Sequence, residues 1–377
     1  MFILEKDLKF PEENFLSMVN QPYEMKGAFS KKRVYQWWKH YNGMVYVSFS
    51  GGLDSCVLAY IVCRAMMEYD LKRYEYNEKT DDYIEKRDVH LVFSNTGLEF
   101  PEIRKHTVFF TEWLQKEFPE LEIVREVIRP KMKFKEVAEK YGFPLVSKNV
   151  ALIVHKLRHG NLSSKYRNYL LNGDERGKFG KLAEKWKFLI NAPFDINNTC
   201  CEKMKHEPMR RYQKKTGRYP IIGVTQDESM WRKRTYNKTG CNDYNSKANP
   251  QSKPIGFWNK QEVLRYAYEH HIPICSVYGD IVCRNGIWDT TREKRTGCMA
   301  CGFGCDQERE PNRFQRMQTM YPKHYKYFMN EIKNNGYSLR EALEYMGIPY
   351  ETWESVGQMN LFDYAGEKAH ENENNLV

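Results

Sequence analysis

The sequence lacks any long hydrophobic run. No stretch of ~18 consecutive apolar residues occurs among its 377 residues, so no transmembrane helix is predicted. The amino terminus, MFILEKDLKF, meets charged residues too early to form the apolar core of a secretory signal. We therefore expect a cytoplasmic protein, in which structural disulfides are rare. Wholesale disorder is not expected either, because 41% of the residues are hydrophobic and 14% are aromatic.

Cysteine and positive charge, by contrast, are plentiful. The chain has 10 cysteines, which in a cytoplasmic protein indicate metal binding, catalysis or core packing. Its net charge is +10, and residues 148–187 carry ten Lys and Arg against three acids, while 202–238 carry eleven against four. Such stretches indicate a polyanionic partner (nucleotide, sulfate or nucleic acid) or else an ordinary solvated surface of mixed charge. Aromatic residues among these cations, such as Tyr166, Tyr169 and Trp186, favour nucleic acid.

Strands alternate with helices along the middle of the chain. Strands are predicted over Met44–Phe49, Val89–Ser94, Leu121–Val127 and Tyr219–Val224, and helices over Cys56–Met67, Pro101–Phe118, Phe134–Tyr141 and Lys260–His271. This alternation predicts an α/β fold with a doubly wound, mostly parallel sheet. We expect an N-terminal extension over 1–43 with a short helix near Lys31–His40, a core domain over 44–306, a helical C-terminal region over 307–365 and a disordered tail over 366–377.

The most informative motif is Ser48-Phe-Ser-Gly-Gly-Leu-Asp-Ser55, at the junction of a predicted strand and helix. Gly51 and Gly52 allow the backbone to approach a phosphate closely, and the start of a helix presents free N–H groups to it. Asp54 either caps the helix or helps to hold Mg²⁺ beside a pyrophosphate.

This motif resembles the PP-loop of the ATP pyrophosphatase superfamily, whose fold is of the adenine nucleotide alpha hydrolase type. Its members cleave ATP between the α and β phosphates and usually adenylylate a substrate. The resemblance implies an adenine nucleotide, with Mg²⁺, bound by Ser48, Ser50, Gly51, Gly52, Leu53, Asp54 and Ser55.

The end of the second predicted strand carries a further resemblance. Phe93-Ser-Asn-Thr-Gly-Leu-Glu-Phe-Pro-Glu102 is similar to the D-T-G-x-x-F-P-E-T stretch of the phosphoadenylyl-sulfate reductase branch, with Asn95 in place of Asp. In that branch the segment lies beside the nucleotide. The resemblance therefore implies that Asn95, Thr96 and Gly97 contact it.

The cysteines fall into two motifs: an adjacent pair, Cys200-Cys201, and the later run Cys298-x₂-Cys301-x₃-Cys305. Four thiolates suit either tetrahedral zinc or an iron–sulfur cluster, and adjacent cysteines favour a cluster because their side chains diverge. The pattern CC-x₃-K-x₂-P with a later GCxxC resembles the assimilatory adenylyl-sulfate reductases. That resemblance implies a [4Fe–4S] cluster on Cys200, Cys201, Cys298 and Cys301, with Lys205 as the neighbouring cation.

Cys305 is one thiol too many for this scheme, so it either replaces a ligand or acts as a redox or sulfur-carrying thiol. Of the remaining cysteines we expect Cys56, Cys63, Cys275 and Cys283 in the core, and the sequence gives no place to Cys241.

The stretch Gly223–Arg232 resembles the family's G-x-R-x-x-x-S-x-x-R segment. Arg232 would then bind an anionic group of the substrate, although a surface position within a basic run is an equal alternative. Thr225 replaces the family's first Arg, which argues against sulfate recognition. With a further similarity at Pro254–Val263, the resemblance extends over about residues 44–306.

Two departures point away from sulfate reduction. No cysteine follows Cys305, whereas the reductases carry a nucleophilic cysteine in a C-terminal tail, and the PP-loop is intact where theirs is degenerate. We therefore expect an ATP-dependent adenylylating sulfurtransferase, similar to the enzymes of DNA phosphorothioation or tRNA thiolation, with nucleic acid as one expected acceptor. The alternatives are an adenylyl-sulfate or phosphoadenylyl-sulfate reductase and a non-catalytic nucleotide-binding subunit of a defence or mobile-element complex.

Two partners follow from these expectations. A cysteine desulfurase would supply sulfur. The stretch Gln358–Phe362 resembles the peptide by which bacterial DNA enzymes bind the sliding clamp, and its alternative is a segment that packs Leu361 and Phe362 onto its own core.

Overall fold

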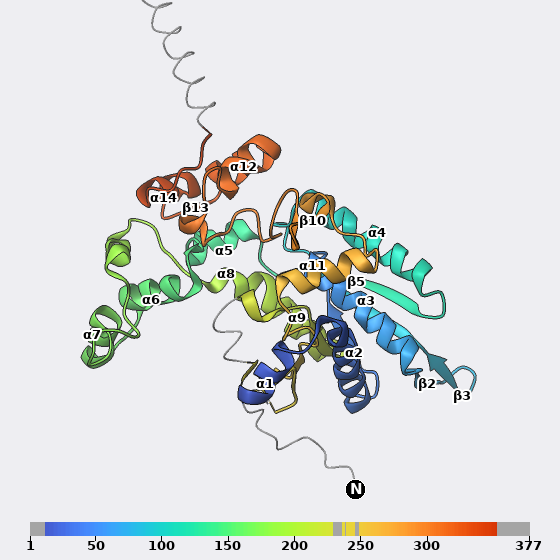
Figure 1. Cartoon of the computed structure of the whole chain (residues 1–377). Coiled ribbons are helices and arrows are strands. Elements are labelled where there is room, and N and C mark those ends of the chain that lie inside the picture. Colours follow the sequence, from blue (N-terminus) through green and yellow to red (C-terminus); the bar gives the residue numbers. More distant parts are fainter. Residues whose placement is uncertain (1–11, 229–235, 238, 246–248, 353–377) are drawn as a thin grey trace, which may run out of the picture. The chain divides into compact units, whose positions relative to one another are not determined.

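The computed structural model describes residues 12–228, 236–237, 239–245 and 249–352 (Figure 1). The chain divides into two compact units, each made of two separate stretches. Unit 1 comprises Met1–Pro130 and Glu207–Thr296, and unit 2 comprises Lys131–His206 and Gly297–Val377. Among the described residues no helix is both long and apolar enough to cross a membrane.

Unit 1 is built on a six-stranded sheet in the order β5-β4-β1-β7-β9-β8. The strands are β1 (Val45–Ser48), β4 (Asp88–Ser94), β5 (Glu122–Ile128), β7 (Tyr219–Ile222), β8 (Asn242–Asp243) and β9 (Gln251–Ser252). Neighbouring strands pair in parallel except β8, which runs antiparallel to β9. The predicted α/β class with a mostly parallel sheet is thus confirmed, and the four predicted strands lie within two residues of the observed ones.

Helix α3 (Leu53–Glu68) forms the centre of unit 1. Twelve of its 16 residues are buried, because it packs between the strands β1 and β4 and the helices α2 (Tyr23–His40) and α11 (Lys260–Glu269). The other helices of unit 1 are α1 (Glu12–Val19), α4 (Pro101–Glu117), α9 (Glu207–Thr216) and the short turns η3 (Gln226–Glu228) and η4 (Ser276–Tyr278). Two hairpins, β2–β3 (Arg73–Asn77, Asp82–Lys86) and β10–β11 (Ile281–Arg284, Ile287–Thr290), complete it.

The N-terminal segment differs from the expected separate extension. Its helix α2 is longer than predicted and buries Trp37 completely in the core of unit 1. The ammonium of Lys26, also buried, donates hydrogen bonds to the Val19 carbonyl (2.8 Å) and to Glu262 on α11 (2.5 Å). The described part of 1–43 therefore belongs to unit 1, because its apolar face is needed to cover α3.

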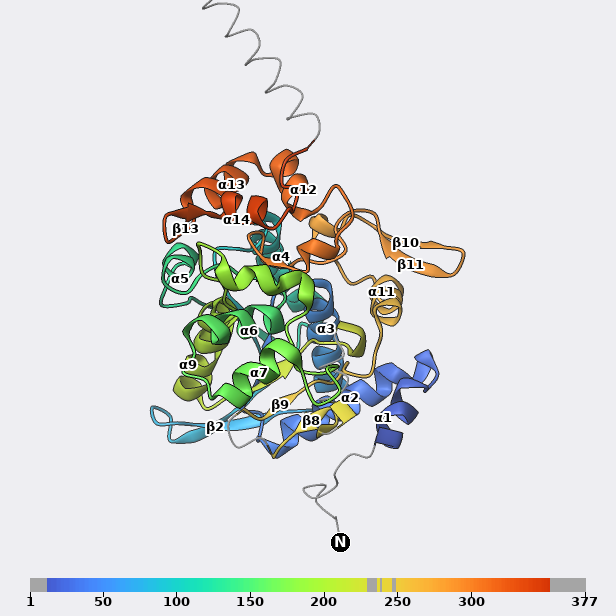
Figure 2. The same ribbon diagram turned by 90° about the vertical axis from the view of Figure 1, so that its left-hand side faces the viewer.

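Unit 2 consists of short helices (Figure 2). They are α5 (Phe134–Tyr141), α6 (Lys148–His159), α7 (Ser164–Asn172), η1 (Glu184–Asn191), α8 (Thr199–Cys201), the π-helix η2 (Glu202–His206), η5 (Cys305–Gln307), α12 (Arg313–Met320), α13 (Pro322–Lys326), the π-helix η6 (Tyr327–Glu331) and α14 (Leu339–Tyr345). Strand β6 (Leu145–Val146) pairs in parallel with β12 (Gly302–Phe303).

The described part of the predicted C-terminal region, residues 307–352, consists of helices and the hairpin β13–β14 (Lys333–Asn334, Tyr337–Ser338). Asn335 and Gly336 form its turn with positive φ values of 50° and 87°, as a two-residue hairpin requires. The expected boundary at residue 306 does not separate the compact units. Asn334 donates to the carbonyls of Ala138 and Glu139 (3.0 Å each), so this hairpin belongs to the body of unit 2.

Candidate functional site

The loop Ser50–Gly52 joins β1 to α3 at the carboxyl edge of the parallel sheet, where nucleotide sites of such folds lie. Gly51 has a φ of +72°, and a Cβ added to it would lie 2.8 Å from Cγ2 of Thr107. A Cβ on Gly52 would lie 3.0 Å from Oγ1 of Thr296. Gly51 is therefore required by its backbone conformation, while Gly52 is closely packed against side-chain hydroxyls.

The two serines of the loop have different environments. The Ser55 hydroxyl is buried, donates to the carbonyl of Gly52 (2.8 Å) and accepts from the Ser50 amide (3.2 Å). Ser50 is exposed, and its hydroxyl accepts from the Gly52 amide (3.3 Å) and lies 3.1 Å from that of Ser55. Ser55 thus shapes the loop, while Ser50 is the hydroxyl that faces solvent.

Asp54 lies in the first turn of α3, where a carboxylate is favoured by the helix dipole. The capping position is held by Gly52, so the prediction that Asp54 caps the helix is wrong. Its side chain is half-buried. Its expected role beside Mg²⁺ stays a prediction.

The end of β4 lies next to the loop in the sheet, because β4 and β1 are neighbouring parallel strands. Glu99 organises this segment: its carboxylate accepts hydrogen bonds from the Thr96 amide (3.2 Å) and hydroxyl (2.5 Å) and from the Gly97 amide (3.0 Å). Asn95 also accepts from the Gly97 amide (3.2 Å). Sequence reasoning missed Glu99, although the Thr-x-x-Glu spacing is a typical signal for such a turn.

Tyr278 is a second residue that the sequence did not predict. Its buried hydroxyl accepts a hydrogen bond from the Leu53 amide at the start of α3 (3.1 Å) and lies 2.7 Å from the Thr296 hydroxyl. Burial raises the pKa of Tyr278, so the hydroxyl stays protonated. The Tyr278 hydroxyl thus accepts from a backbone N–H at the start of a helix, and such N–H groups are donors that bind phosphate oxygens. No local pattern indicates this contact, since 225 positions separate the two residues.

Thr225 and Arg232 follow β7. A Cβ on Gly223 would lie 2.9 Å from the carbonyl oxygen of Asp54, so this segment passes directly against α3. The Thr225 hydroxyl is buried and donates to Asp227 (2.7 Å). At the position of the family's first Arg, this chain therefore has an uncharged hydroxyl that is hydrogen-bonded to a neighbouring side chain. Arg232 lies outside the described residues, so its expected role stays a prediction.

In unit 2, two backbone features position the cysteine pairs. Asn197 accepts hydrogen bonds from the Thr199 amide (3.0 Å) and hydroxyl (2.7 Å) and fixes the start of α8, which carries Cys200 and Cys201. The amide of Cys301 donates to the carbonyl of Cys298 (3.1 Å) and closes a turn between them. Strand β12 then anchors this turn against β6.

The four predicted thiols come together. Burial raises the pKa of Cys200 most, and the sulfurs of Cys298, Cys201 and Cys301 raise it further. Burial and Cys298 likewise raise the pKa of Cys301 to about 11. Because burial and the neighbouring sulfurs raise these pKa values, the free thiols do not readily ionise as a group. A bound cation or cluster would relieve the repulsion, because it stabilises the thiolates.

Lys205 is the cation beside these thiols. It lies in the π-helix η2, whose wider turn follows Cys200 and Cys201 directly, and π-turns are frequent at functional sites. The charge on Cys298, a hydrogen bond to the same sulfur, and the charges on Cys201 and Cys301 all raise its pKa. The implied role of Lys205 as a counter-charge to four thiolates stays a prediction.

Which metal or cluster these thiols would hold stays a prediction. In the part of the chain that is described, no group of three or more Cys, His, Asp or Glu side chains converges closely enough for one metal ion. A single zinc needs its four sulfurs within one tetrahedron, whereas a cluster spreads one thiolate over each iron.

Cys305 is the fifth cysteine of unit 2. Its thiol is buried, and burial raises its pKa to about 12, which disfavours the thiolate that a nucleophile requires. Arg313 contacts both the segment after Cys305 and the turn that carries Cys301. Its guanidinium donates to Glu308 (2.8 Å) and to the Cys301 carbonyl (2.9 Å), a contact that the sequence did not indicate. The catalytic role of Cys305 stays a prediction.

Of the remaining cysteines, Cys56, Cys63 and Cys275 are buried as expected. Cys283 is exposed on β10, so its predicted core position is wrong, because this two-stranded hairpin presents it to solvent. Cys241 is buried in the core of unit 1.

Comparison with known proteins agrees with this fold and these motifs. The family model of the phosphoadenosine phosphosulfate reductase domain matches residues 44–301, and the chain belongs to this family. An adenosine 5′-phosphosulfate reductase from Deinococcus radiodurans is 26% identical over 102 residues, which span 26% of this chain and 38% of that relative. The crystal structure of phosphoadenylyl-sulfate reductase from Candida auris, a phosphate complex, covers 71% of this chain and 91% of its own, with 13% identity and a TM-score of 0.34.

Proposed function

We propose that this protein is an ATP-dependent adenylylating sulfurtransferase with nucleic acid as its acceptor. The observation that carries the proposal is the PP-loop. Gly51 has the positive φ that such a loop uses, Gly52 is closely packed, Ser50 is exposed and Asp54 is half-buried, which supports a phosphate-binding role.

In this proposal the loop residues bind the phosphates of ATP, and Asp54 holds Mg²⁺. An acceptor oxygen attacks the α-phosphorus, and the bond to the bridging oxygen of the β-phosphate breaks. Pyrophosphate then leaves with its charge partly neutralised by the metal. The helix dipole of α3 favours the same developing charge. A sulfur nucleophile subsequently displaces AMP from the adenylated acceptor.

Cys200, Cys201, Cys298 and Cys301 would hold a [4Fe–4S] cluster, which would supply sulfur-transfer or electron-transfer chemistry. Lys205 places a positive charge beside these thiolates and would attract an anionic sulfur donor or substrate. A cysteine desulfurase is the proposed source of sulfur. The Gln358–Phe362 segment, which lies outside the described residues, is proposed to bind a sliding clamp.

The second candidate is a sulfonucleotide reductase, which the family membership supports. In that case the loop would bind the phosphate of adenylyl sulfate or phosphoadenylyl sulfate, and an external thiol would be the nucleophile. The neutral, internally bonded Thr225 favours the first candidate, because a sulfate-binding site is expected to supply a cation there.

The test uses anaerobically purified full-length protein incubated with ATP, Mg²⁺ and candidate DNA or RNA acceptors. The proposal expects pyrophosphate release that is lost in Asp54→Asn and kept in Asp82→Asn, a control on the exposed hairpin β2–β3. Thioredoxin-dependent sulfite formation from adenylyl sulfate without pyrophosphate release would instead establish the reductase. Inactivity in both assays despite nucleotide binding would point to a non-catalytic subunit.

A further inference from the structure

A surface of unit 2 that belongs to neither predicted site is formed by α7 and the turn after it. Residues 163–169 are all exposed, and Leu170 is the one buried residue of α7. The rings of Tyr166 and Tyr169 lie nearly parallel, with centroids 6.2 Å apart and planes at 15°. A helix with so little packing is unusual unless it serves contacts outside the chain.

The turn after α7 is tightly ordered. The Asp174 carboxylate accepts hydrogen bonds from the amides of Lys178 (2.8 Å) and Phe179 (3.2 Å), and the Asp174 amide donates to the Phe179 carbonyl (2.9 Å). This network holds the Phe179 side chain at 67% exposure. The turn therefore leaves a large apolar ring exposed among the described residues.

The turn and α7 form one continuous surface. Gly180 has a φ of +83°, and a Cβ on it would lie 2.0 Å from the ring of Tyr169. The Leu182 amide then donates to the Leu170 carbonyl (2.8 Å). Only a glycine lets the returning chain lie flat on the tyrosine, which fixes Phe179 relative to α7. We call residues 163–187 the α7 platform.

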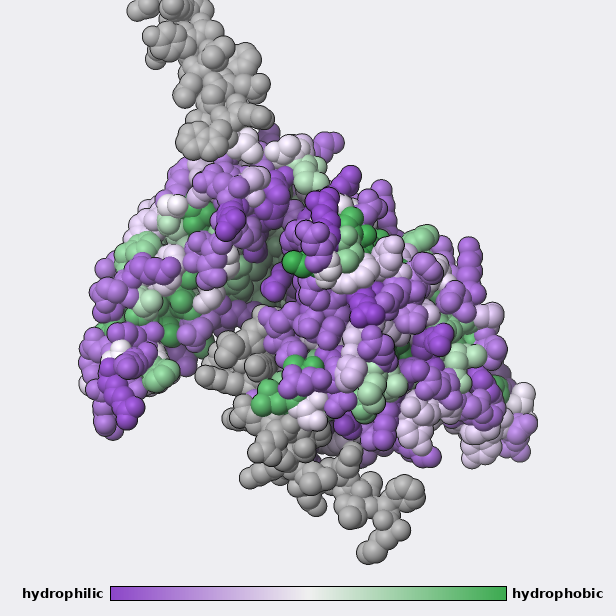
Figure 3. All heavy atoms as spheres, viewed as in Figure 1, coloured by the Kyte–Doolittle hydropathy of each residue, from purple (hydrophilic) through white to green (hydrophobic). Residues whose placement is uncertain are grey.

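Cations surround these rings. The ammonium of Lys156 on α6 lies 5.5 Å from the centroid of the Tyr166 ring and donates to its hydroxyl (3.2 Å). Lys165, Lys178 and Lys181 are exposed, and none of them forms an ion pair with the described residues. In Figure 3 hydrophilic residues dominate the region of α7, with scattered apolar ones among them.

We propose that the α7 platform binds single-stranded nucleic acid. Phe179 stacks on an unpaired base, the tyrosine pair forms the floor beside it, and the unpaired lysines bind the phosphates. A duplex hides its base faces, so the exposed Phe179 suits a single strand. This inference rests on the proposed function, because it identifies where the acceptor would bind.

The test is fluorescence anisotropy of full-length protein with labelled single-stranded DNA, single-stranded RNA and duplex DNA of about 20 nucleotides, a length that exceeds one binding site. Phe179→Ser is expected to weaken single-strand binding about tenfold without changing its salt dependence. The triple change Lys165→Gln, Lys178→Gln and Lys181→Gln is expected to lower the slope of log K against log salt by about two.

Two matched controls separate these effects from general surface changes. Tyr83→Ser removes a ring with 65% exposure from the hairpin β2–β3, and Lys105→Gln with Lys116→Gln removes exposed charge from α4. Both should bind like the wild type. The proposal is overturned if the wild type binds no single strand at low salt, if duplex binds equally well, or if Phe179→Ser behaves like Tyr83→Ser.

The same preparations are assayed for pyrophosphate release. Single-strand binding without pyrophosphate release on any acceptor would overturn the proposed function but not the platform. Pyrophosphate release on a nucleic-acid acceptor that is unchanged in Phe179→Ser and in the triple lysine variant would overturn the platform alone.

Discussion

Tyr278 accepts a hydrogen bond from a backbone donor that the proposed nucleotide would need. Its hydroxyl accepts the hydrogen bond of the Leu53 amide, a donor at the start of α3 that a phosphate oxygen would otherwise use. In Tyr278→Phe that buried amide loses its acceptor, which costs about 1 to 3 kcal/mol in the free protein. We expect a lower Tm without nucleotide and tighter binding of ATP, by up to about tenfold, because the phosphate relieves the cost.

Calorimetry with and without ATP measures both the Tm and the affinity for ATP. The matched control is Tyr46→Phe, since the Tyr46 hydroxyl is also buried and accepts one hydrogen bond, from Gln213 (3.0 Å), away from the loop. That variant should lose stability without gaining affinity. Equal affinities in both variants would contradict the competition between Tyr278 and phosphate.

The cysteines allow a second comparison of single residues. Cys200→Ser removes one of four neighbouring thiols, and we expect loss of most iron and sulfide from the anaerobically purified protein. Cys305→Ser should keep both, because Cys305 is not one of the four expected ligands. Iron and acid-labile sulfide per chain, with the visible absorbance, measure the difference. Iron loss in Cys305→Ser with retention in Cys200→Ser would reverse the assignment of ligands.

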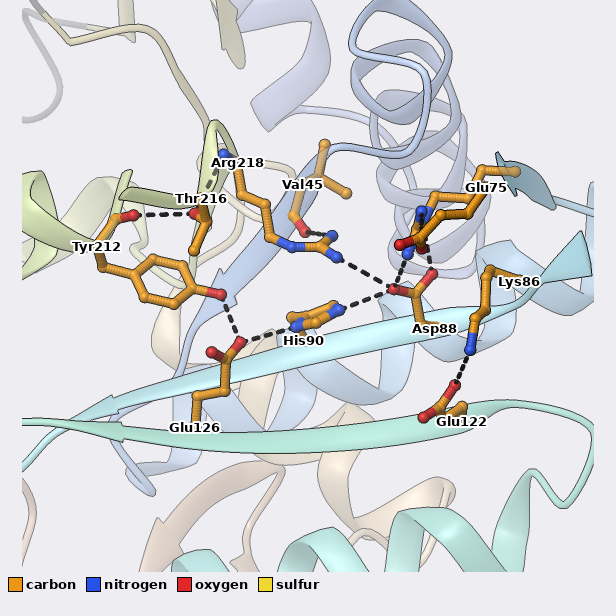
Figure 4. Close-up of polar contacts among 11 residues, drawn as sticks. Val45, Glu75, Lys86, Asp88, His90, Glu122, Glu126, Tyr212, Thr216 and Arg218 are labelled. Carbon is orange, nitrogen blue, oxygen red and sulfur yellow. Dashed lines mark hydrogen bonds and ion pairs between the residues drawn. The ribbon is translucent and has the colours of Figure 1, made fainter. Parts of the chain in front are cut away.

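At the scale of elements, a charged network joins β4, β5 and α9 (Figure 4). The Asp88 carboxylate bonds His90 Nε2 (2.8 Å), Arg73 (2.8 Å) and Arg218 (3.2 Å), and His90 Nδ1 lies 2.7 Å from Glu126, which accepts from Tyr212 (2.5 Å). Every charge in it has a partner, so it fixes the strands and α9 relative to one another.

This network predicts acid sensitivity. Burial alone would raise the pKa of Asp88, but the hydrogen bonds from His90 and Arg73 lower it below its ordinary 3.8. A lowered carboxylate pKa stabilises the fold above the unfolded value and loses that contribution as the pH falls below about 4. Asp88→Asn should cost about 3 to 5 kcal/mol at neutral pH, because the buried Arg218 and the partly buried Arg73 lose a counter-charge.

Urea unfolding between pH 7 and pH 3 measures this effect, with Asp82→Asn on the exposed hairpin as the control. The wild type and the control should lose stability together in acid, whereas Asp88→Asn should show a flatter decline. A parallel decline in all three would mean that Asp88 does not dominate the acid response.

For the whole molecule, the interleaved units predict the outcome of truncation. A chain ending at residue 306 is expected not to form unit 2, because Asn334 and the fully buried Ile332 are part of its body. Asn334→Ala removes hydrogen bonds to Ala138, Glu139 and Asp195 and should lower stability by about 2 to 4 kcal/mol. Asn168→Ala on the exposed α7 is the control and should change it little. Cooperative unfolding by circular dichroism measures both, and a folded 1–306 chain would contradict the division.

The sequence by itself determined the elements and the chemistry of the motifs. The apolar run before Ser50, the glycines and the helix after them specify a phosphate loop locally, and strand–helix alternation specifies a parallel sheet. The cysteine pairs could likewise be interpreted from the sequence, since four thiols with a neighbouring Lys205 are typical of metal or cluster binding.

The tertiary structure alone decided which distant residues complete these sites. Tyr278 reaches Leu53, Arg313 holds the Cys301 carbonyl, and α2 covers α3, because these contacts depend on how remote segments pack rather than on local periodicity. The exposure of Phe179 was likewise decided by the tertiary structure, since only the folded turn shows that the described residues leave this ring exposed. Local sequence fixes hydrogen bonding and periodicity over a few residues, while burial is a property of the whole packed unit.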